Sequence, residues 1–63
     1  MTFTMTLECD NAAFDQDPQI EIARILAKLA DQIHRGPDMI GAEAGGRLLD
    51  INGNHVGDWE VTP

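Results

Sequence analysis

The sequence has little of several residue types, and each scarcity excludes a class of protein. Cys9 is the only cysteine in 63 residues, so the chain lacks the disulfide framework that supports most secreted domains of this size. No apolar run approaches the roughly 20 residues that span a bilayer, and the N-terminal segment lacks the basic residues of a secretion signal. We therefore expect one cytoplasmic domain, 1–63, that makes no membrane contact.

Positive charge is also scarce. Four Lys and Arg residues stand against eleven Asp and Glu residues, which gives a formal net charge of −7. Such a balance disfavours direct binding to nucleic acid or to an anionic membrane and favours a basic partner. Solubility alone is the other explanation for the acidity, so the positions of the carboxylates in the fold decide between the two.

Residues that carry catalysis or bind metal are few and scattered. A structural metal site needs three or four converging ligands. The sequence offers Cys9 on an inward strand face, His34 at a helix end and His55 at a hairpin. It contains no Ser/His/Asp or Cys/His arrangement and no glycine-rich phosphate loop. We expect no catalytic residue, no metal site, no cofactor and no enzymatic activity.

The first segment, 2–10, has the period of a strand with one buried and one wet face. Apolar side chains occupy the odd positions, which predicts that they point inward, and polar ones occupy the even positions. The following loop contains Phe14, which we expect to anchor it to the core. The inward residues are Phe3, Met5, Leu7 and Cys9.

The segment 18–35 has the period of an amphipathic helix. Asp17 is placed to cap its start, Pro18 suits a first helical turn, and Gly36-Pro37 predicts a left-handed stop. The opposite face mixes both signs of charge, so the helix is nearly neutral. The apolar stripe is Ile22, Ile25, Leu26, Leu29 and Ile33, and the mixed face is Glu21, Arg24, Lys28, Asp31 and Arg35.

A glycine-rich stretch, 38–46, predicts a linker, and 47–62 predicts a hairpin with Asn52-Gly53 at its bend. Two registers are open. A two-residue loop sets Leu49 opposite Val56 and Asp50 opposite His55, and it requires a bulge near Gly57. A four-residue loop, 52–55, pairs Leu48 with Trp59 instead. The alternation in both strands leaves the choice undecided.

These elements predict a two-layer α+β domain of the order β-α-β-β, with one helix packed on a three-stranded, mainly antiparallel sheet. We expect the first strand to lie beside the last, which gives the order 2-3-1. A first strand parallel to the second is the alternative. The predicted core contains Ile25, Leu26, Leu29 and Trp59.

Parity along the strands predicts an acidic face on the wet side of the sheet. If Cys9 points inward, Glu8 and Asp10 point outward, and if Trp59 points inward, Asp58 and Glu60 point outward. Asp50 joins them only in the bulged register. The predicted partner-binding residues are Glu8, Asp10, Asp50, Asp58 and Glu60, with no Lys or Arg assigned to the same surface.

Three segments together carry a resemblance: ECDNAAF at the end of the first strand, the helix IEIARILAKLADQI, and LLDINGNHVGDWEV. In this order they resemble a family of very short phage and prophage proteins. In size, charge and layout the chain is similar to anti-CRISPR inhibitors of type I surveillance complexes, possible targets including type I-C. The resemblance implies a phage-encoded DNA mimic that acts in the host bacterial cell by binding a basic DNA-binding surface of a Cas protein. It assigns no functional residues.

Two other functions stay open. A phage or prophage accessory or regulatory protein could bind a host protein through an apolar patch, with Met39 and Ile40 as contacts. A small enzyme or metal protein is the third. In the favoured reading the protein acts as a monomer, blocks target DNA binding by the Cascade complex, and does not itself contact nucleic acid.

Overall fold

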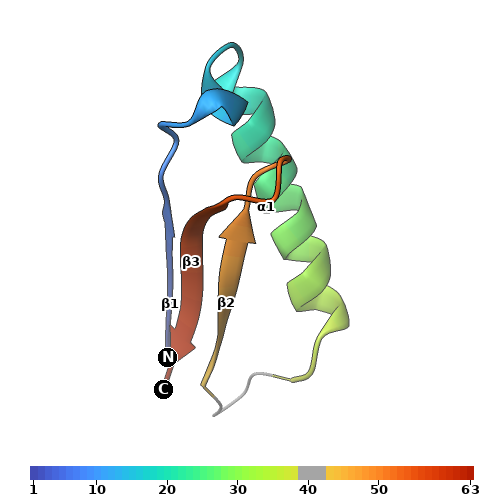
Figure 1. Cartoon of the computed structure of the whole chain (residues 1–63). Coiled ribbons are helices and arrows are strands. Elements are labelled where there is room, and N and C mark those ends of the chain that lie inside the picture. Colours follow the sequence, from blue (N-terminus) through green and yellow to red (C-terminus); the bar gives the residue numbers. More distant parts are fainter. Residues whose placement is uncertain (39–42) are drawn as a thin grey trace.

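A computed structural model describes residues 1–38 and 43–63 of the chain. Its elements are β1 (Thr2–Leu7), the 3-10 helix η1 (Ala12–Phe14), α1 (Pro18–Arg35), β2 (Ala44–Leu49) and β3 (His55–Thr62). The strands form one antiparallel sheet in the order β1-β3-β2, and α1 lies along one side of it (Figure 1). The predicted α+β class and strand order are confirmed. In these two described ranges, no helix is long and apolar enough to cross a membrane.

Helix α1 begins and ends where the sequence predicts, although its ends are capped differently. Asp17 occupies the N-cap, but its side chain makes no capping hydrogen bond; its backbone carbonyl accepts from the N–H of Ile20 at 3.0 Å. Gly36 is extended, with φ −79° and ψ −178°, so the predicted left-handed stop is wrong. The chain leaves the helix in an extended conformation that suits the residue before Pro37.

Strand β2 begins earlier than the sequence predicts, because 44–46 belongs to the sheet and not to the linker. A Cβ at Gly46 would lie 2.8 Å from Nε1 of Trp59, and one at Gly45 would lie 2.9 Å from the Trp59 carbonyl oxygen. The two glycines therefore leave room for the tryptophan of the neighbouring strand. Strand β1 is shorter than expected and ends at Leu7 rather than at residue 10.

The hairpin uses neither of the two predicted registers. Leu49 pairs with His55 and Leu48 pairs with Gly57, so Val56 is an extra residue that forms a bulge. The turn runs over 50–54, where the N–H of Gly53 donates to the Asp50 carbonyl at 3.0 Å and the N–H of Asp50 donates to the Asn54 carbonyl at 2.9 Å. Gly53 has φ +83°, the left-handed region that favours glycine. The expected bend is present, with five residues, 50–54, between the paired Leu49 and His55.

The core lies between α1 and the sheet. The predicted anchor Phe14 is 3% exposed, and the predicted helix residues Ile25 and Leu29 are buried, but Leu26 is 45% exposed. Leu26 is rotated by about 100° around the helix axis from Ile25, which places it on the flank of the buried stripe. Trp59 is half-buried and packs against the core from β3. The buried cluster is Phe14, Ile25, Leu29, Leu48 and Val56.

Candidate functional site

The face of the sheet turned away from α1 is the candidate partner-binding surface, and we call it the outer face. Strand pairing defines its members, because residues directly opposite each other in neighbouring strands point to the same side. Thr2, Thr4 and Thr6 of β1 pair with Thr62, Glu60 and Asp58 of β3. On the other side of β3, Gly45 and Arg47 of β2 pair with Glu60 and Asp58.

Asp58 and Glu60 occupy the middle of the outer face because β3 is the central strand. They are two residues apart on one strand, which separates them by roughly 6.6 Å. Both are exposed. The hydroxyl of Thr4 donates to Oε1 of Glu60 at 3.5 Å, a long contact that leaves most of the carboxylate available. The outward parity predicted for these two residues is confirmed.

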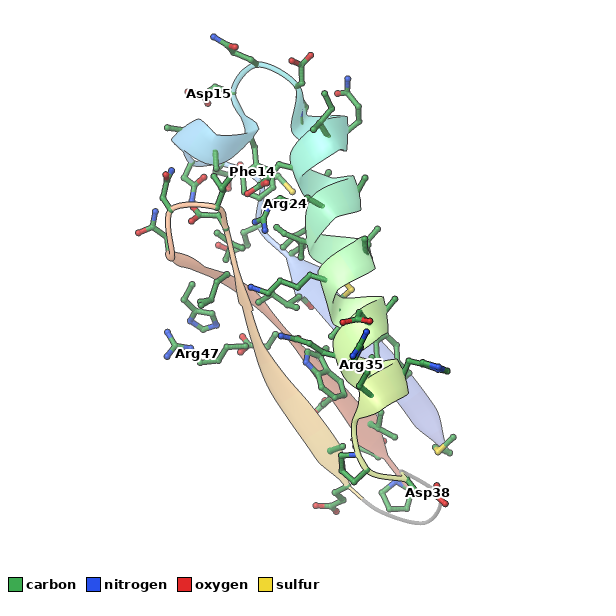
Figure 2. All side chains as sticks on the ribbon, turned by 90° about the vertical axis from the view of Figure 1, so that its right-hand side faces the viewer. Phe14, Asp15, Arg24, Arg35, Asp38 and Arg47 are labelled. Carbon is green, nitrogen blue, oxygen red and sulfur yellow. The ribbon has the colours of Figure 1, made fainter. Side chains whose placement is uncertain are left out.

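Two side chains that are not acidic, those of Arg47 and His55, lie beside Asp58 on this surface. Arg47 pairs directly with Asp58 in the sheet, and its side chain points away from α1 (Figure 2). Nε2 of His55 lies 3.0 Å from Oδ1 of Asp58. The expectation of an outer face without Lys or Arg is therefore wrong. The cause is the hairpin register, which sequence alternation left open and which places Arg47 beside the central strand.

Glu8 and Asp10 lie near the outer face to different degrees. The N–H of Glu8 donates to the Val56 carbonyl at 2.7 Å, so Glu8 continues the pairing of β1 with β3 by one residue. Asp10 lies in the connection to η1, outside all three strands. Both side chains are exposed. The structure thus brings Glu8 to the edge of the outer face and leaves Asp10 beyond it.

Asp50 is not on this surface, contrary to the expectation. It is 4% exposed, and its Oδ1 accepts from the N–H groups of Asn52 and Asn54 at 2.8 and 2.9 Å. Its Oδ2 accepts from the side-chain amides of Asn11 and Asn54 at 2.7 and 3.1 Å. Burial raises the pKa of the Asp50 carboxyl, but these hydrogen bonds from Asn54, Asn11 and Asn52 outweigh it and lower the pKa overall. The carboxylate holds the hairpin turn against the loop that precedes η1.

Glu21 is a second buried carboxylate, although the helical pattern placed it on the solvent face. It is 6% exposed and accepts from Nε and Nη2 of Arg24 at 2.6 and 3.1 Å. It also accepts from the N–H of Ile51 at 2.8 Å. The Arg24 guanidinium lowers the pKa of the Glu21 carboxyl, against the opposing effect of burial. Helical periodicity carries no signal for this role, because the hairpin turn that covers Glu21 is distant in sequence.

The two sets of carboxylates can do different chemistry. Asp50 accepts four internal hydrogen bonds and Glu21 accepts three, and both side chains are buried, so neither is exposed to a partner. Asp58 and Glu60 can accept charge-assisted hydrogen bonds from Arg or Lys of another protein. Within 1–38 and 43–63, no group of three or more His, Cys, Asp and Glu residues is placed to hold a metal ion.

The chain was also compared with known proteins. No protein-family model matches it, and neither a curated protein nor a solved structure was found to be similar to it.

Proposed function

We propose that this chain is a small binding protein, not an enzyme, and that its outer face contacts a basic surface of a partner protein. The observation that carries the proposal is the pair Asp58 and Glu60, exposed side by side on the central strand of a chain with net charge −7. The resemblance drawn from the sequence makes the DNA-binding surface of a Cas subunit in a type I complex the first partner to test. There the chain would act as an anti-CRISPR inhibitor.

The physical basis is competition with nucleic acid for the same cationic groups. A DNA-binding surface presents Arg and Lys side chains toward phosphates. Carboxylates that meet those side chains replace the phosphates, and the negative field of the whole chain speeds the encounter at low salt. Binding of this kind weakens as salt rises, because surface charges are screened beyond roughly 8 Å at physiological ionic strength.

Arg47 sharpens the proposal, because it is the cation placed beside Asp58. If the outer face meets a basic partner, Arg47 opposes the contact and its removal strengthens binding. If the binding surface lies elsewhere, loss of Arg47 changes only the overall charge. The effect of Arg47 therefore distinguishes this face from the rest of the molecule.

The main experiment compares two double variants that remove the same charge. Asp58→Asn with Glu60→Gln changes the outer face, and Asp15→Asn with Asp31→Asn changes exposed positions outside it. Both move the net charge from −7 to −5. We expect the first to weaken binding to a purified type I surveillance complex at least about tenfold, equivalent to about 1.4 kcal/mol. The second should weaken it much less.

A third variant, Arg47→Gln, is measured beside them and is expected to bind more tightly than the wild type. Thermal melts establish that each variant is folded. Equal losses in the two doubles, with no gain from Arg47→Gln, would place the interface away from the outer face. In cells that carry a type I system, wild-type protein should restore plaques of a targeted phage, and the outer-face double should not.

A second candidate function is binding to a host protein through apolar contacts. Ile20 and Ile51 are 64% and 68% exposed and line one hollow at the end of the molecule where α1 begins. Met39 and Ile40, the contacts expected for this function, lie outside the described residues. Apolar binding would survive high salt and would be lost in Ile20→Ser with Ile51→Ser, whereas the electrostatic interface would show the opposite behaviour.

A further inference from the structure

Strand β1 is an edge strand without the features that normally protect one. It pairs with β3 on one side only, and no other described strand lies against its second side (Figure 1). Its residues, TFTMTL, include no charge, no proline and no glycine. Exposed edges are usually blocked by charged side chains, proline or a bulge, because their free N–H and C=O groups accept another strand. The opposite edge, β2, carries Arg47.

The direction of the backbone groups in β1 follows from one hydrogen bond. The N–H of Glu8 points to β3, since it donates to the Val56 carbonyl. Successive residues of a strand point their N–H and C=O groups to alternate sides. The groups of Thr2, Thr4 and Thr6 therefore point to β3, and those of Phe3, Met5 and Leu7 point to the free edge.

On the side of the sheet that faces α1, strand β1 carries an apolar side chain that is only half covered. Phe3 is 49% exposed although its ring stacks on Trp59, with 6.0 Å between ring centroids. Met5 and Leu7, on the same side, are only partly buried. A strand added to the free edge would cover these three side chains.

We propose that the free edge of β1 binds β1 of a second copy of this chain, antiparallel and across a two-fold axis, to form a continuous six-stranded sheet. The axis passes between Thr4 and Thr4 of the second copy. Phe3 then pairs with Met5 of the second copy on the helix side, and Thr2 pairs with Thr6 of the second copy on the outer face. Both helices lie on the same side of the joined sheet.

This register follows from the hydrogen-bond directions and from charge. Residues that exchange hydrogen bonds must both face the free edge, as Phe3 and Met5 do. Centring the pairing on Thr4 matches Thr with Thr and apolar with apolar over the whole of 2–6. A shift that centres it on Met5 instead would set Thr2 against Glu8 of the second copy. Cross-strand Thr pairs and apolar pairs are favourable contacts in antiparallel sheets.

The charge of the molecule also selects this edge. Two copies that each carry a net charge of −7 repel each other. The repulsion is smallest at a contact where no charged side chain lies opposite one of the same sign. The strand β1 offers such a surface. A two-fold contact is self-complementary, as an antiparallel strand pair requires. The second copy is therefore the occupant that fits the free edge.

The decisive experiment traps the pair by a disulfide. In a Cys9→Ala background, Thr4→Cys would set two cysteines opposite each other at a position without backbone hydrogen bonds. There the Cα atoms lie about 4.5 Å apart, within the range that disulfides span. We expect mild oxidation to yield a covalent dimer on a denaturing gel. Thr62→Cys in the same background is the matched control, since Thr62 lies on the central strand, and it should form no covalent dimer on the same gel.

The register is tested by mixing two variants. Thr2→Cys and Thr6→Cys, each in the Cys9→Ala background, should cross-link to each other and not to themselves. Self-linking of either, without the mixed product, would contradict the register centred on Thr4.

The uncrosslinked protein gives an independent reading of mass. Sedimentation of the wild-type protein should give a mass of twice the 6.9 kDa of one chain. The variant Thr4→Lys should give the mass of one chain, because two lysines would face each other at the axis. Thr62→Lys makes the same change of net charge and should remain dimeric. A wild-type mass of one chain at every concentration up to the solubility limit would overturn the proposal, as would equal cross-linking of Thr4→Cys and Thr62→Cys.

Discussion

Two groups of acidic residues in this molecule have opposite surroundings. At the end where α1 begins, Asp50 and Glu21 are buried, and each accepts several hydrogen bonds from its neighbours. On the outer face, Asp58 and Glu60 are exposed and make few internal contacts. The first pair joins the hairpin turn to the helix and to the loop before η1. The second pair is free to meet another molecule.

This difference shows that net charge alone says little about a binding surface. Two of the carboxylates that contribute to the net charge of −7, those of Glu21 and Asp50, are buried in the fold. Buried carboxylates are stable only when internal donors compensate their lost hydration. Only the exposed acids are accessible to a partner. Positions, not totals, therefore separate the acids that stabilise the fold from those available to a partner.

The largest effect is expected in the core, at Leu29. Because Leu29 is 4% exposed, Leu29→Ala should cost about 2–5 kcal/mol, comparable with the whole stability of a domain this small. Leu26→Ala is the matched control, since Leu26 is the neighbouring stripe residue that the structure leaves 45% exposed. Thermal melts should show a much larger loss for Leu29→Ala. Equal losses would contradict the packing of α1 described above.

A smaller effect separates the two acidic groups directly. Asp50→Asn replaces an acceptor oxygen by an amide that faces the donors of Asn11, Asn54 or the turn, so we expect a clear fall in the melting midpoint. Asp58→Asn makes the same change on the outer face and should alter stability by no more than about 0.5 kcal/mol, as surface substitutions usually do. Similar falls in both variants would erase the distinction between the groups.

The smallest effect concerns acid sensitivity. The folded state lowers the pKa of Glu21 below its ordinary 4.5 and that of Asp50 below its ordinary 3.8. Stability from these groups is therefore fully present above those values and is lost as the pH falls through the lowered pKa values. Denaturant melts from pH 6 to pH 2 should show this decline. Glu21→Gln with Asp50→Asn should be less stable at neutral pH and should decline less steeply below about pH 4.

Asp58→Asn is the control for that measurement. It should retain the wild-type decline, because Glu21 and Asp50 are unchanged in it. A decline of equal steepness in the buried double would assign the acid sensitivity to other carboxylates.

Sequence patterns predicted the parts of the fold that depend on local periodicity. The bounds of α1 follow from a 3.6-residue apolar period with Pro18 at one end and Gly36-Pro37 at the other. The inward parity of β1 and β3 follows from strict alternation, and it placed Asp58 and Glu60 on the outer face. Both features are read within a few residues of chain.

The features that sequence patterns missed depend on contacts between distant residues. The glycines at 45 and 46 resemble a linker until Trp59 is placed against them. Asp50 in the turn at 50–54 accepts a hydrogen bond from Asn11, which lies 39 residues before it. The same turn sets the position of Arg47 beside Asp58 and the burial of Glu21. Alternation describes each strand alone, so it cannot supply the register between two strands.

Gly57 limits how this chain can diverge. Next to the bulge at Val56, a Cβ at position 57 would fall onto the carbonyl oxygen of Thr6 in the neighbouring strand. Every other residue type carries that atom, so substitution here would force β1 and β3 apart. Descendants of this sequence can replace the acids of the outer face whenever their partner changes, yet they are expected to keep the glycine at position 57. Position 57 is therefore the reference point from which distant relatives should be aligned.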